Sequence, residues 1–170
     1  MMRPIHIEIS TILAREPAEI CAQILDTEQW RTFTGYSILP GVAQASFEKE
    51  TPQIVGSRIR VKNTDGSTHV EEIIEWDVPR QIRLRFQEFQ PPLQHLAEQF
   101  IETWSFQPTL DDVYSTQKKA QLSCVPNIEV TRAMDLYPKN WLGWLILLPV
   151  SRLMKKAFLQ NLQSLINAER

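Results

Sequence analysis

The C-terminal part of the chain carries the clearest helical pattern. After Pro149, apolar side chains recur at intervals of three and four residues, which places them on one broad face of a helix. These apolar residues are Val150, Leu153, Met154, Ala157, Phe158, Leu162, Leu165 and Ile166. Polar and basic residues, among them Arg152, Lys155 and Lys156, occupy most of the opposite side. The pattern predicts a helix over residues 151–167 whose apolar face needs a large partner surface.

Before this helix, apolar and polar residues alternate in a series of short segments, which is the period of a half-buried strand. The predicted strands cover residues 5–10, 42–48, 58–62, 68–76, 82–87, 97–106 and 115–125. Turn signals separate them, including Asp65-Gly66 between the third and fourth strands. Because the connections are short, the pattern indicates an antiparallel sheet.

Two short helical segments follow the first strand. Pro17 suits the first turn of a helix, and Glu16 and Glu19 suit its positive end. Ile20, Ile24 and Leu25 then form a buried face, which predicts a helix within residues 15–25. Residues 26–33 are expected to form a second short helix or turn.

These elements together predict an α+β fold in a single domain covering residues 1–170. A strongly twisted sheet of this size curls around whatever covers its apolar face, and the last helix is the largest available cover. Curved sheets packed on one helix often leave apolar space between the two layers, and such space is a natural ligand site.

Composition narrows the function classes. The chain has 170 residues and a net charge of −2, which gives no reason to expect nucleic-acid binding, because proteins that bind polyanions usually show a clustered basic footprint. Cys21 and Cys124 lack metal-ligand spacing, and the three histidines are scattered along the sequence. We therefore expect no metal and no cofactor. The N-terminus lacks the apolar core of a signal peptide, and a cytoplasmic protein is expected.

Several short motifs follow one another in a characteristic order along nearly the whole chain. They are Pro17-Ala18-Glu19-Ile20, Leu25-Asp26 with Trp30, Val55-Gly56, Asp65-Gly66, Glu75-Trp76-Asp77-Val78-Pro79, Ile82-Arg83-Leu84-Arg85-Phe86, Glu102-Thr103-Trp104-Ser105-Phe106 and the final helix from Pro149 to Leu165. In this order they resemble the START-like (SRPBCC) superfamily, and most closely its polyketide cyclase/dehydrase-like branch.

The resemblance implies a helix-grip fold, in which a curved antiparallel sheet of about six to seven strands wraps around a long C-terminal helix. It also implies a cavity for a lipid, polyketide, isoprenoid or aromatic metabolite. Members of this superfamily share no catalytic signature, so no active-site residue can be transferred to this chain.

Strand parity selects the residues expected to line the cavity. The predicted lining comprises Val70, Glu72, Ile74, Trp76, Leu84, Phe86, Phe100, Glu102, Trp104, Met154 and Phe158. Glu72 and Glu102 stand out because a carboxylate on an apolar face must be paired, hydrogen-bonded or protonated. A raised pKa would suit either glutamate to general acid–base work or to anchoring a ligand hydroxyl. The alternative is that a β-bulge turns them to solvent, or that an arginine pairs with them structurally.

Two functions from different classes follow. The first is a non-catalytic protein that binds a hydrophobic or amphipathic small molecule for transport, sequestration or sensing. The second is a cyclase, dehydratase or hydrolase with Glu72 or Glu102 as acid or base. The sequence shows no nucleophile motif, cofactor loop or metal cluster, which favours the first.

The segment 141–148, from Trp141 to Leu148, is too apolar for an ordinary connection. In one interpretation it is part of the last helix and is buried against the sheet. In the other it is a movable lid at the cavity mouth, which makes transient contact with a membrane or a protein partner through Trp141 and Trp144.

Overall fold

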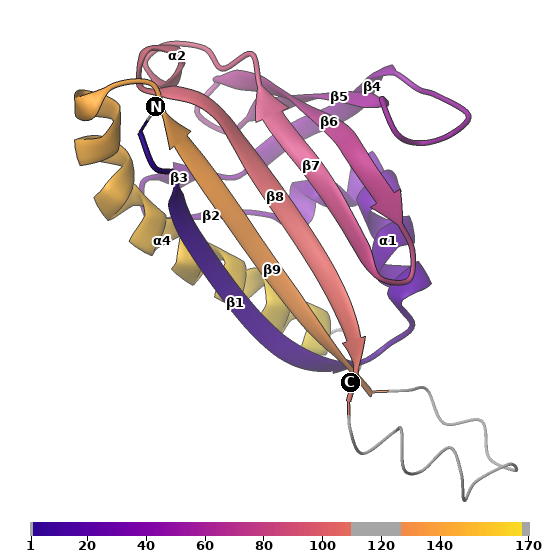
Figure 1. Cartoon of the computed structure of the whole chain (residues 1–170). Helices are drawn as coiled ribbons and strands as arrows, with labels where there is room; N and C mark the ends of the chain where they lie inside the picture. The colour runs from indigo at the N-terminus through magenta and orange to yellow at the C-terminus, as the bar shows by residue number, and fades with distance from the viewer. Residues whose placement is uncertain (1, 110–126, 168–170) are drawn as a thin grey trace, which may run out of the picture.

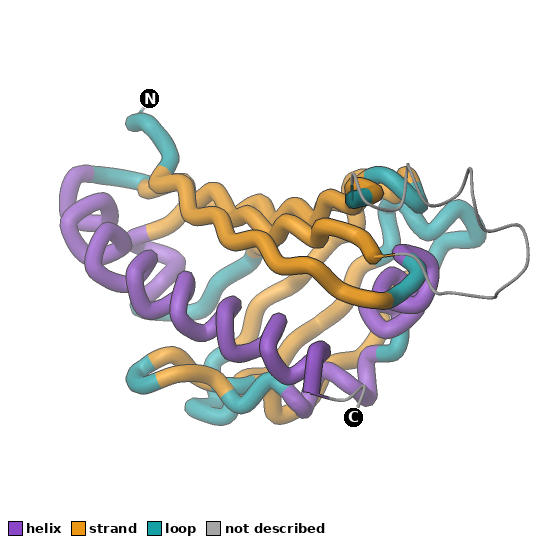
Figure 2. The backbone as a smooth tube through the Cα atoms, turned by 90° about the horizontal axis from the view of Figure 1, so that it is seen from below, coloured by secondary structure: helices purple, strands orange, loops and turns teal. Residues whose placement is uncertain are grey.

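The computed structural model describes residues 2–109 and 127–167 of the chain. Within these residues, one antiparallel sheet of seven strands curves around a long helix, α4 (Trp141–Asn167) (Figures 1 and 2). The strand order is β1-β9-β8-β7-β6-β5-β4. The strands are β1 (Ile5–Ala14), β4 (Val42–Lys49), β5 (Arg58–Asn63), β6 (Thr68–Asp77), β7 (Gln81–Gln87), β8 (Ala97–Pro108) and β9 (Asn127–Pro138). The predicted helix-grip architecture is confirmed.

Several smaller elements connect the strands of the sheet. Helix α1 (Pro17–Leu25) and the 3-10 helix η1 (Thr27–Thr32) follow β1, as the sequence predicts. A short hairpin of β2 (Gly35–Tyr36) and β3 (Leu39–Pro40) comes next, and the one-turn helix α2 (Leu93–Leu96) precedes β8. In Figure 2, α4 runs across the concave side of the sheet, with the β2–β3 hairpin beyond it.

The last strand differs from its prediction. The expected strand over 115–125 lies outside the described residues, and β9 was not predicted at all. In β9, Ile128, Val130, Met134 and Leu136 are buried on one face. Arg132 occupies the same parity and interrupts this apolar alternation, which hides the strand in the sequence. Because β9 pairs with both β1 and β8, it joins the first strand to the rest of the sheet.

Helix α4 begins ten residues earlier than predicted, because Pro149 lies inside the helix and not at its start. A proline removes one helical N–H donor. Beside it, the Ser151 hydroxyl donates to the carbonyl of Leu148 at 2.7 Å. At the true start, the Asn140 side-chain oxygen accepts the N–H of Gly143 at 2.8 Å, which is an N-cap hydrogen bond.

The start of α4 is fastened to α2. Lys139 Nζ donates to the carbonyl of Gln94, and Asn140 Nδ2 donates to the carbonyl of His95, both at 2.9 Å. Gly143 lies so close that a Cβ there would stand 2.0 Å from the carbonyl oxygen of Leu96. Only glycine permits this backbone approach.

The inner face of α4 packs as predicted where its side chains are described. Phe158 and Leu162 are buried in the core between sheet and helix, and Met154 packs partly buried against it. Leu147 is also buried, whereas Trp141 and Trp144 are exposed. Segment 141–148 is therefore helical, but most of it is not buried against the sheet. In the part of the chain that the structure describes, α4 included, no helix is both long enough and apolar enough to span a bilayer.

The close contact of Gly143 with α2 predicts a selective loss of stability. Gly143→Ala should lower the free energy of unfolding by about 1–3 kcal/mol, because the new methyl group meets backbone that has to move. Chemical denaturation followed by circular dichroism measures the effect. Gln160→Ala, at an exposed position of the same helix, is the control and should change stability very little. Equal stabilities for the two variants would contradict the contact.

Candidate functional site

A cavity of about 560 Å³ lies between the concave face of the sheet and α4. Strands β6 to β9 supply one wall, and Met154, Ala157 and Phe158 of α4 supply another. Residues of α1, η1 and the β2–β3 hairpin, such as Ile24, Trp30 and Leu39, complete the lining. Most of the lining side chains are aliphatic or aromatic, so the cavity offers a mainly apolar, ligand-sized space. Its polar lining residues are Arg15, Gln23, Gln29, Thr32, Asn63, His69, Glu71, Glu102, Arg132 and Asn161.

Many of the residues expected to line the cavity do so. They come from the regular parts of β7, β8 and α4 and comprise Leu84, Phe86, Phe100, Glu102, Trp104, Met154 and Phe158. Strand parity worked here because the pairing of β7 with β8 runs without a register shift from Gln81 to Phe86.

The residues expected from β6 lie elsewhere. The register of β6 against β7 shifts between Ile73 and Glu75, which marks a β-bulge. A bulge inverts parity along the strand, so Glu71 lines the cavity while Val70, Glu72 and Ile74 do not. Trp76 does turn toward the core, but it lines a separate small pocket beside Cys21, Ile54 and Val78.

Glu72 is held in an ion pair outside the cavity. Its carboxylate accepts hydrogen bonds from Arg85 Nη2 and Gln87 Nε2, both at 2.8 Å. Partial burial works to raise the pKa of Glu72, but the hydrogen bonds and the positive charge of Arg85 outweigh it and leave the pKa below its usual value. The prediction that Glu72 lines the cavity is therefore wrong. The alternative, a structural ion pair with an arginine, is what the structure shows for this residue.

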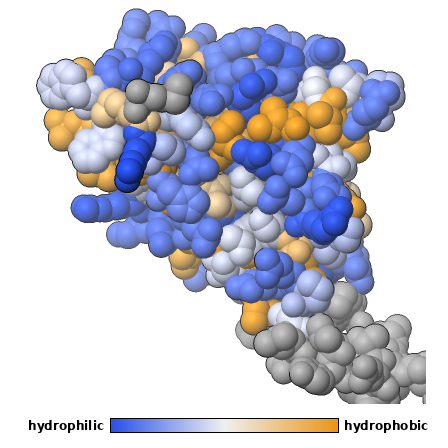
Figure 3. All heavy atoms as spheres, viewed as in Figure 1, coloured by the Kyte–Doolittle hydropathy of each residue, from blue (hydrophilic) through white to orange (hydrophobic). Residues whose placement is uncertain are grey.

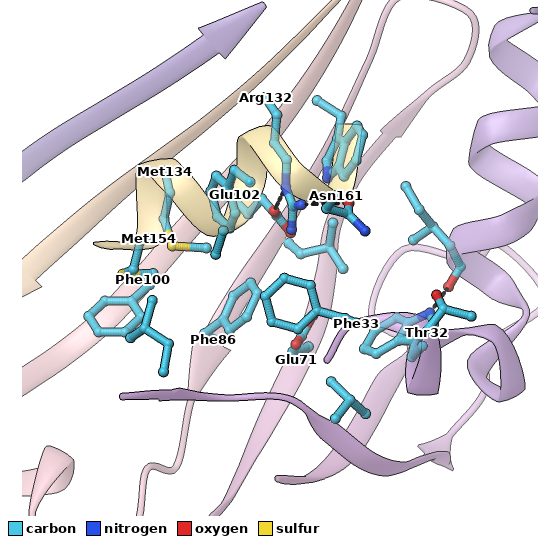
Figure 4. A pocket seen from close by; sticks show the side chains of 18 of the residues that line it. Thr32, Phe33, Glu71, Phe86, Phe100, Glu102, Arg132, Met134, Met154 and Asn161 are labelled. Carbon is cyan, nitrogen blue, oxygen red and sulfur yellow. Dashed lines mark hydrogen bonds and ion pairs between the residues drawn. The ribbon is translucent and has the colours of Figure 1, made fainter. Parts of the chain in front are cut away.

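Glu102 reaches the cavity wall, and there it forms an ion pair with Arg132 of β9. Both side chains are deeply buried. Arg132 Nη1 also donates to Asn161 Oδ1 of α4 at 3.0 Å. Its guanidinium lies 3.7 Å from the ring centroid of Phe158 and 4.6 Å from that of Trp104, in cation–π contact with both. Figure 4 shows the Glu102–Arg132 pair with Asn161 beside it.

A second pair of polar side chains in the cavity wall is formed by His69 and Glu71, which the sequence analysis does not single out. His69 Nε2 lies 3.1 Å from Glu71 Oε1, and both residues line the cavity. The His69 ring stacks on Phe86, with 5.5 Å between ring centroids. Burial raises the pKa of the Glu71 carboxyl above its usual range; His69 and Arg132 oppose this rise, and the nearby charge of Glu102 adds to it.

Other candidate chemistry is sparse in the described part of the chain. Among residues 2–109 and 127–167, no three His, Cys, Asp or Glu side chains converge as a metal site would require. Cys21 is buried, and burial raises the pKa of its thiol to about 11, so it is an unreactive thiol. Cys124 lies outside the described residues.

The buried Glu102–Arg132 pair predicts strong energetic coupling. Arg132→Met or Glu102→Gln alone should cost about 3–5 kcal/mol, because each leaves one charge buried without its partner. The double variant should recover most of that loss. Denaturant unfolding of the four proteins measures the coupling.

The Glu72–Arg85 pair offers a matched control on the outside of the sheet. Arg85→Met should cost no more than about 1 kcal/mol, as expected of a partly exposed pair. If the Arg132 and Glu102 losses simply add in the double variant, the two side chains are not coupled.

Comparison with known proteins agrees with this architecture. The family model described as polyketide cyclase/dehydrase and lipid transport matches residues 4–168. No curated protein matches the chain. Among solved structures, a START superfamily protein from Mycobacterium smegmatis is similar with a TM-score of 0.67 at 10% identity, over 97% of this chain and 99% of that one.

Two further structures share the fold. A protein from Thermus thermophilus superposes with a TM-score of 0.63 at 15% identity, covering 97% of this chain and 99% of its own. Ginseng major latex-like protein 151 from Panax ginseng gives 0.53 at 13% identity, covering 91% and 97%. Because the family model covers residues 4–168, the chain belongs to the polyketide cyclase/dehydrase and lipid transport family of START-like proteins.

Proposed function

We propose that this protein binds a hydrophobic or amphipathic small molecule, such as a lipid, polyketide, isoprenoid or aromatic metabolite, in the cavity between the sheet and α4. The observation that carries the proposal is an apolar cavity of about 560 Å³ in a fold whose family is described as one of lipid transport. Cavities of about 300–1,000 Å³ are typical of small-molecule sites. Binding would serve transport, sequestration or sensing.

The lining explains why an apolar ligand would enter. Phe86, Phe89 and Phe100 present aromatic surface from β7, β8 and the connection between them. Apolar surface of this kind gains about 25 cal/mol for each Å² removed from water. The polar groups Glu102 and Arg132 neutralise one another, so they do not demand a charged ligand.

A catalytic function is the second candidate, and one observation favours it. The Glu71 carboxyl is buried in the cavity beside His69, and its pKa is raised, which suits proton transfer to or from a bound substrate. Under this alternative the protein is a cyclase, dehydratase or hydrolase with Glu71 in the acid–base role expected of Glu72 or Glu102.

We also propose transient contact with a membrane rich in anionic lipids, through the first turns of α4. Trp141 is 71% exposed, and Leu142, Trp144, Leu145 and Ile146 are exposed with it. Figure 3 shows pale and hydrophobic side chains at the left edge of the view, where α4 begins. Tryptophan is the side chain favoured at the membrane–water interface.

The charges of α4 favour an anionic surface. The helix contains Arg152, Lys155 and Lys156 but no acidic residue, while the whole chain carries a net charge of −2. Trp141, Leu145, Arg152 and Lys156 follow one another at intervals of four, seven and four residues, so the exposed apolar side continues directly into basic residues. Interfacial helices combine apolar and basic groups in this way.

Ligand binding is tested with the neutral dye N-phenyl-1-naphthylamine. We expect saturable fluorescence enhancement near one dye per chain, and a higher melting temperature at saturation. A ligand at a hundred times its Kd stabilises the native state by about 2.7 kcal/mol. If neither dye binding nor stabilisation occurs across a panel of apolar molecules, the proposed function is wrong.

The variant Ala157→Leu tests whether the dye binds within the cavity. Ala157 is buried in the wall, and the larger side chain should weaken dye binding about tenfold, which corresponds to about 1.4 kcal/mol. Ala14→Leu, at an exposed position of β1, is the matched control and should bind dye as the unmodified protein does. Equal weakening in both variants would place the dye elsewhere.

Membrane contact is tested by sedimentation with vesicles of phosphatidylcholine with and without phosphatidylserine. The variant with Trp141→Ala and Trp144→Ala should bind the anionic vesicles about tenfold more weakly, a loss of about 1.4 kcal/mol. Its melting temperature should hardly change because both side chains are exposed. Ile12→Ala removes an exposed apolar side chain of β1 and is the control. A large loss of stability without any loss of vesicle binding would contradict the proposal.

A further inference from the structure

The His69–Glu71 pair differs from the Glu102–Arg132 pair in how far its hydrogen-bonding capacity is used. Arg132 bonds to Glu102 and Asn161 and is covered by the rings of Phe158 and Trp104. Within residues 2–109 and 127–167, the hydrogen-bond partner of the Glu71 carboxyl is His69, which contacts its Oε1 atom. The Glu71 carboxyl therefore retains hydrogen-bonding capacity at the cavity wall.

Aromatic rings pack against the pair at that wall. The His69 ring is nearly parallel to that of Phe86, at an interplanar angle of 12°, and also packs beside Phe89. Glu71 is only 6% exposed. Figure 4 shows Glu71 at the cavity wall, apart from the Glu102–Arg132 pair, with Phe86 and Phe100 among the side chains that line the space. A ligand lying on these rings would present its own atoms to the Glu71 carboxyl.

The charges around the pair select against an anionic ligand group. Two arginines line the cavity: Glu102 already compensates the positive charge of Arg132, and Arg15 has an interaction of its own. Among the described residues of the lining, a ligand carboxylate would therefore lose its hydration without gaining an arginine that is not already engaged, which is costly in an apolar site. A neutral hydroxyl or carbonyl group loses far less on entering.

On the basis of the proposed ligand binding, we infer that the His69–Glu71 pair binds an uncharged oxygen of the ligand, a hydroxyl or a carbonyl group. The cavity is then selective for amphipathic molecules with a neutral polar group over carboxylates of the same chain length. A protonated carboxyl both donates and accepts hydrogen bonds, so it serves alcohols and ketones alike. Burial of Glu71, which favours its protonated form, agrees with this role.

The test compares 1-dodecanol, 2-dodecanone and dodecanoate as competitors of N-phenyl-1-naphthylamine at neutral pH. The unmodified protein should bind the alcohol and the ketone about tenfold or more tightly than the carboxylate. This difference in affinity is larger than one neutral hydrogen bond alone typically contributes. Tighter binding of dodecanoate would overturn the inference while leaving the proposed function intact. Failure of the dye itself to bind would count against the proposed function instead.

Variants locate the selectivity. Glu71→Leu, and His69→Phe, which keeps a ring against Phe86, should each weaken dodecanol binding about tenfold without weakening dye binding. Glu71→Gln retains a neutral donor and acceptor and should keep most of the dodecanol affinity. Glu72→Leu, on the same strand but outside the cavity, is the matched control and should not change the ligand preference. Unchanged dodecanol affinity in Glu71→Leu would overturn the inference.

The pH dependence of stability tests whether the buried Glu71 carboxyl is protonated in the native protein. Glu71 faces His69, with Glu102 and Arg132 as the other charges nearby, and its folded pKa lies above the unfolded value. The unfolded chain therefore releases this proton at lower pH than the native protein does, and native stability should fall as pH rises from the unfolded pKa through the folded one. Glu71→Gln should remove this contribution. The melting temperature of the variant, relative to that of the unmodified protein, should therefore rise with pH. A gap independent of pH would mean that Glu71 is charged, and the inference would fail.

Discussion

The ion pair of Glu102 and Arg132 is the interaction on which the interior depends. It joins β8 to β9 and, through Asn161 and the ring of Phe158, joins both strands to α4. Charges taken out of water hold one another strongly, because each is expensive to leave alone. The pair therefore fixes the helix against a sheet that curves away from it, and a cavity remains where helix and sheet do not meet.

The same cavity wall contains two kinds of polar site. Arg132 and Glu102 satisfy each other and act as part of the scaffold. His69 and Glu71 stand on β6, which β7 separates from β8, and the Glu71 carboxyl keeps hydrogen-bonding capacity to spare in surroundings that disfavour a net charge. An apolar lining supplies affinity with little discrimination, so the few polar groups decide which amphipathic molecules are accepted. Under the proposed function, specificity would rest on His69 and Glu71, the pair whose hydrogen-bonding capacity is less fully used.

Much of the fold was predictable from periodicity, and the exceptions have physical causes. Alternation predicted the inward residues of β7 and β8 because those strands pair regularly. It misplaced Glu72 because a bulge near Ile74 leaves no mark in the sequence. Strand β9 was overlooked because Arg132 interrupts its apolar face, yet a lone arginine at an inward position is itself a signal of a buried ion pair. Pro149 suggested a helix start because the preceding turns are held by contacts with α2. These contacts join distant parts of the chain and leave no local pattern in the sequence.

Those contacts with α2 have a consequence for how the exposed start of α4 meets any surface. Lys139 and Asn140 are bonded to the carbonyls of Gln94 and His95, and Gly143 rests against Leu96. Contacts of this kind preorganise the segment, which favours surface contact through a fixed helix over contact through a hinged lid. The segment loses little conformational entropy when it contacts a surface. A flexible segment would have to become ordered on contact, and that cost would weaken its association. Docking and release would then leave the shape of the helix unchanged, and opening of the cavity would fall to other parts of its wall.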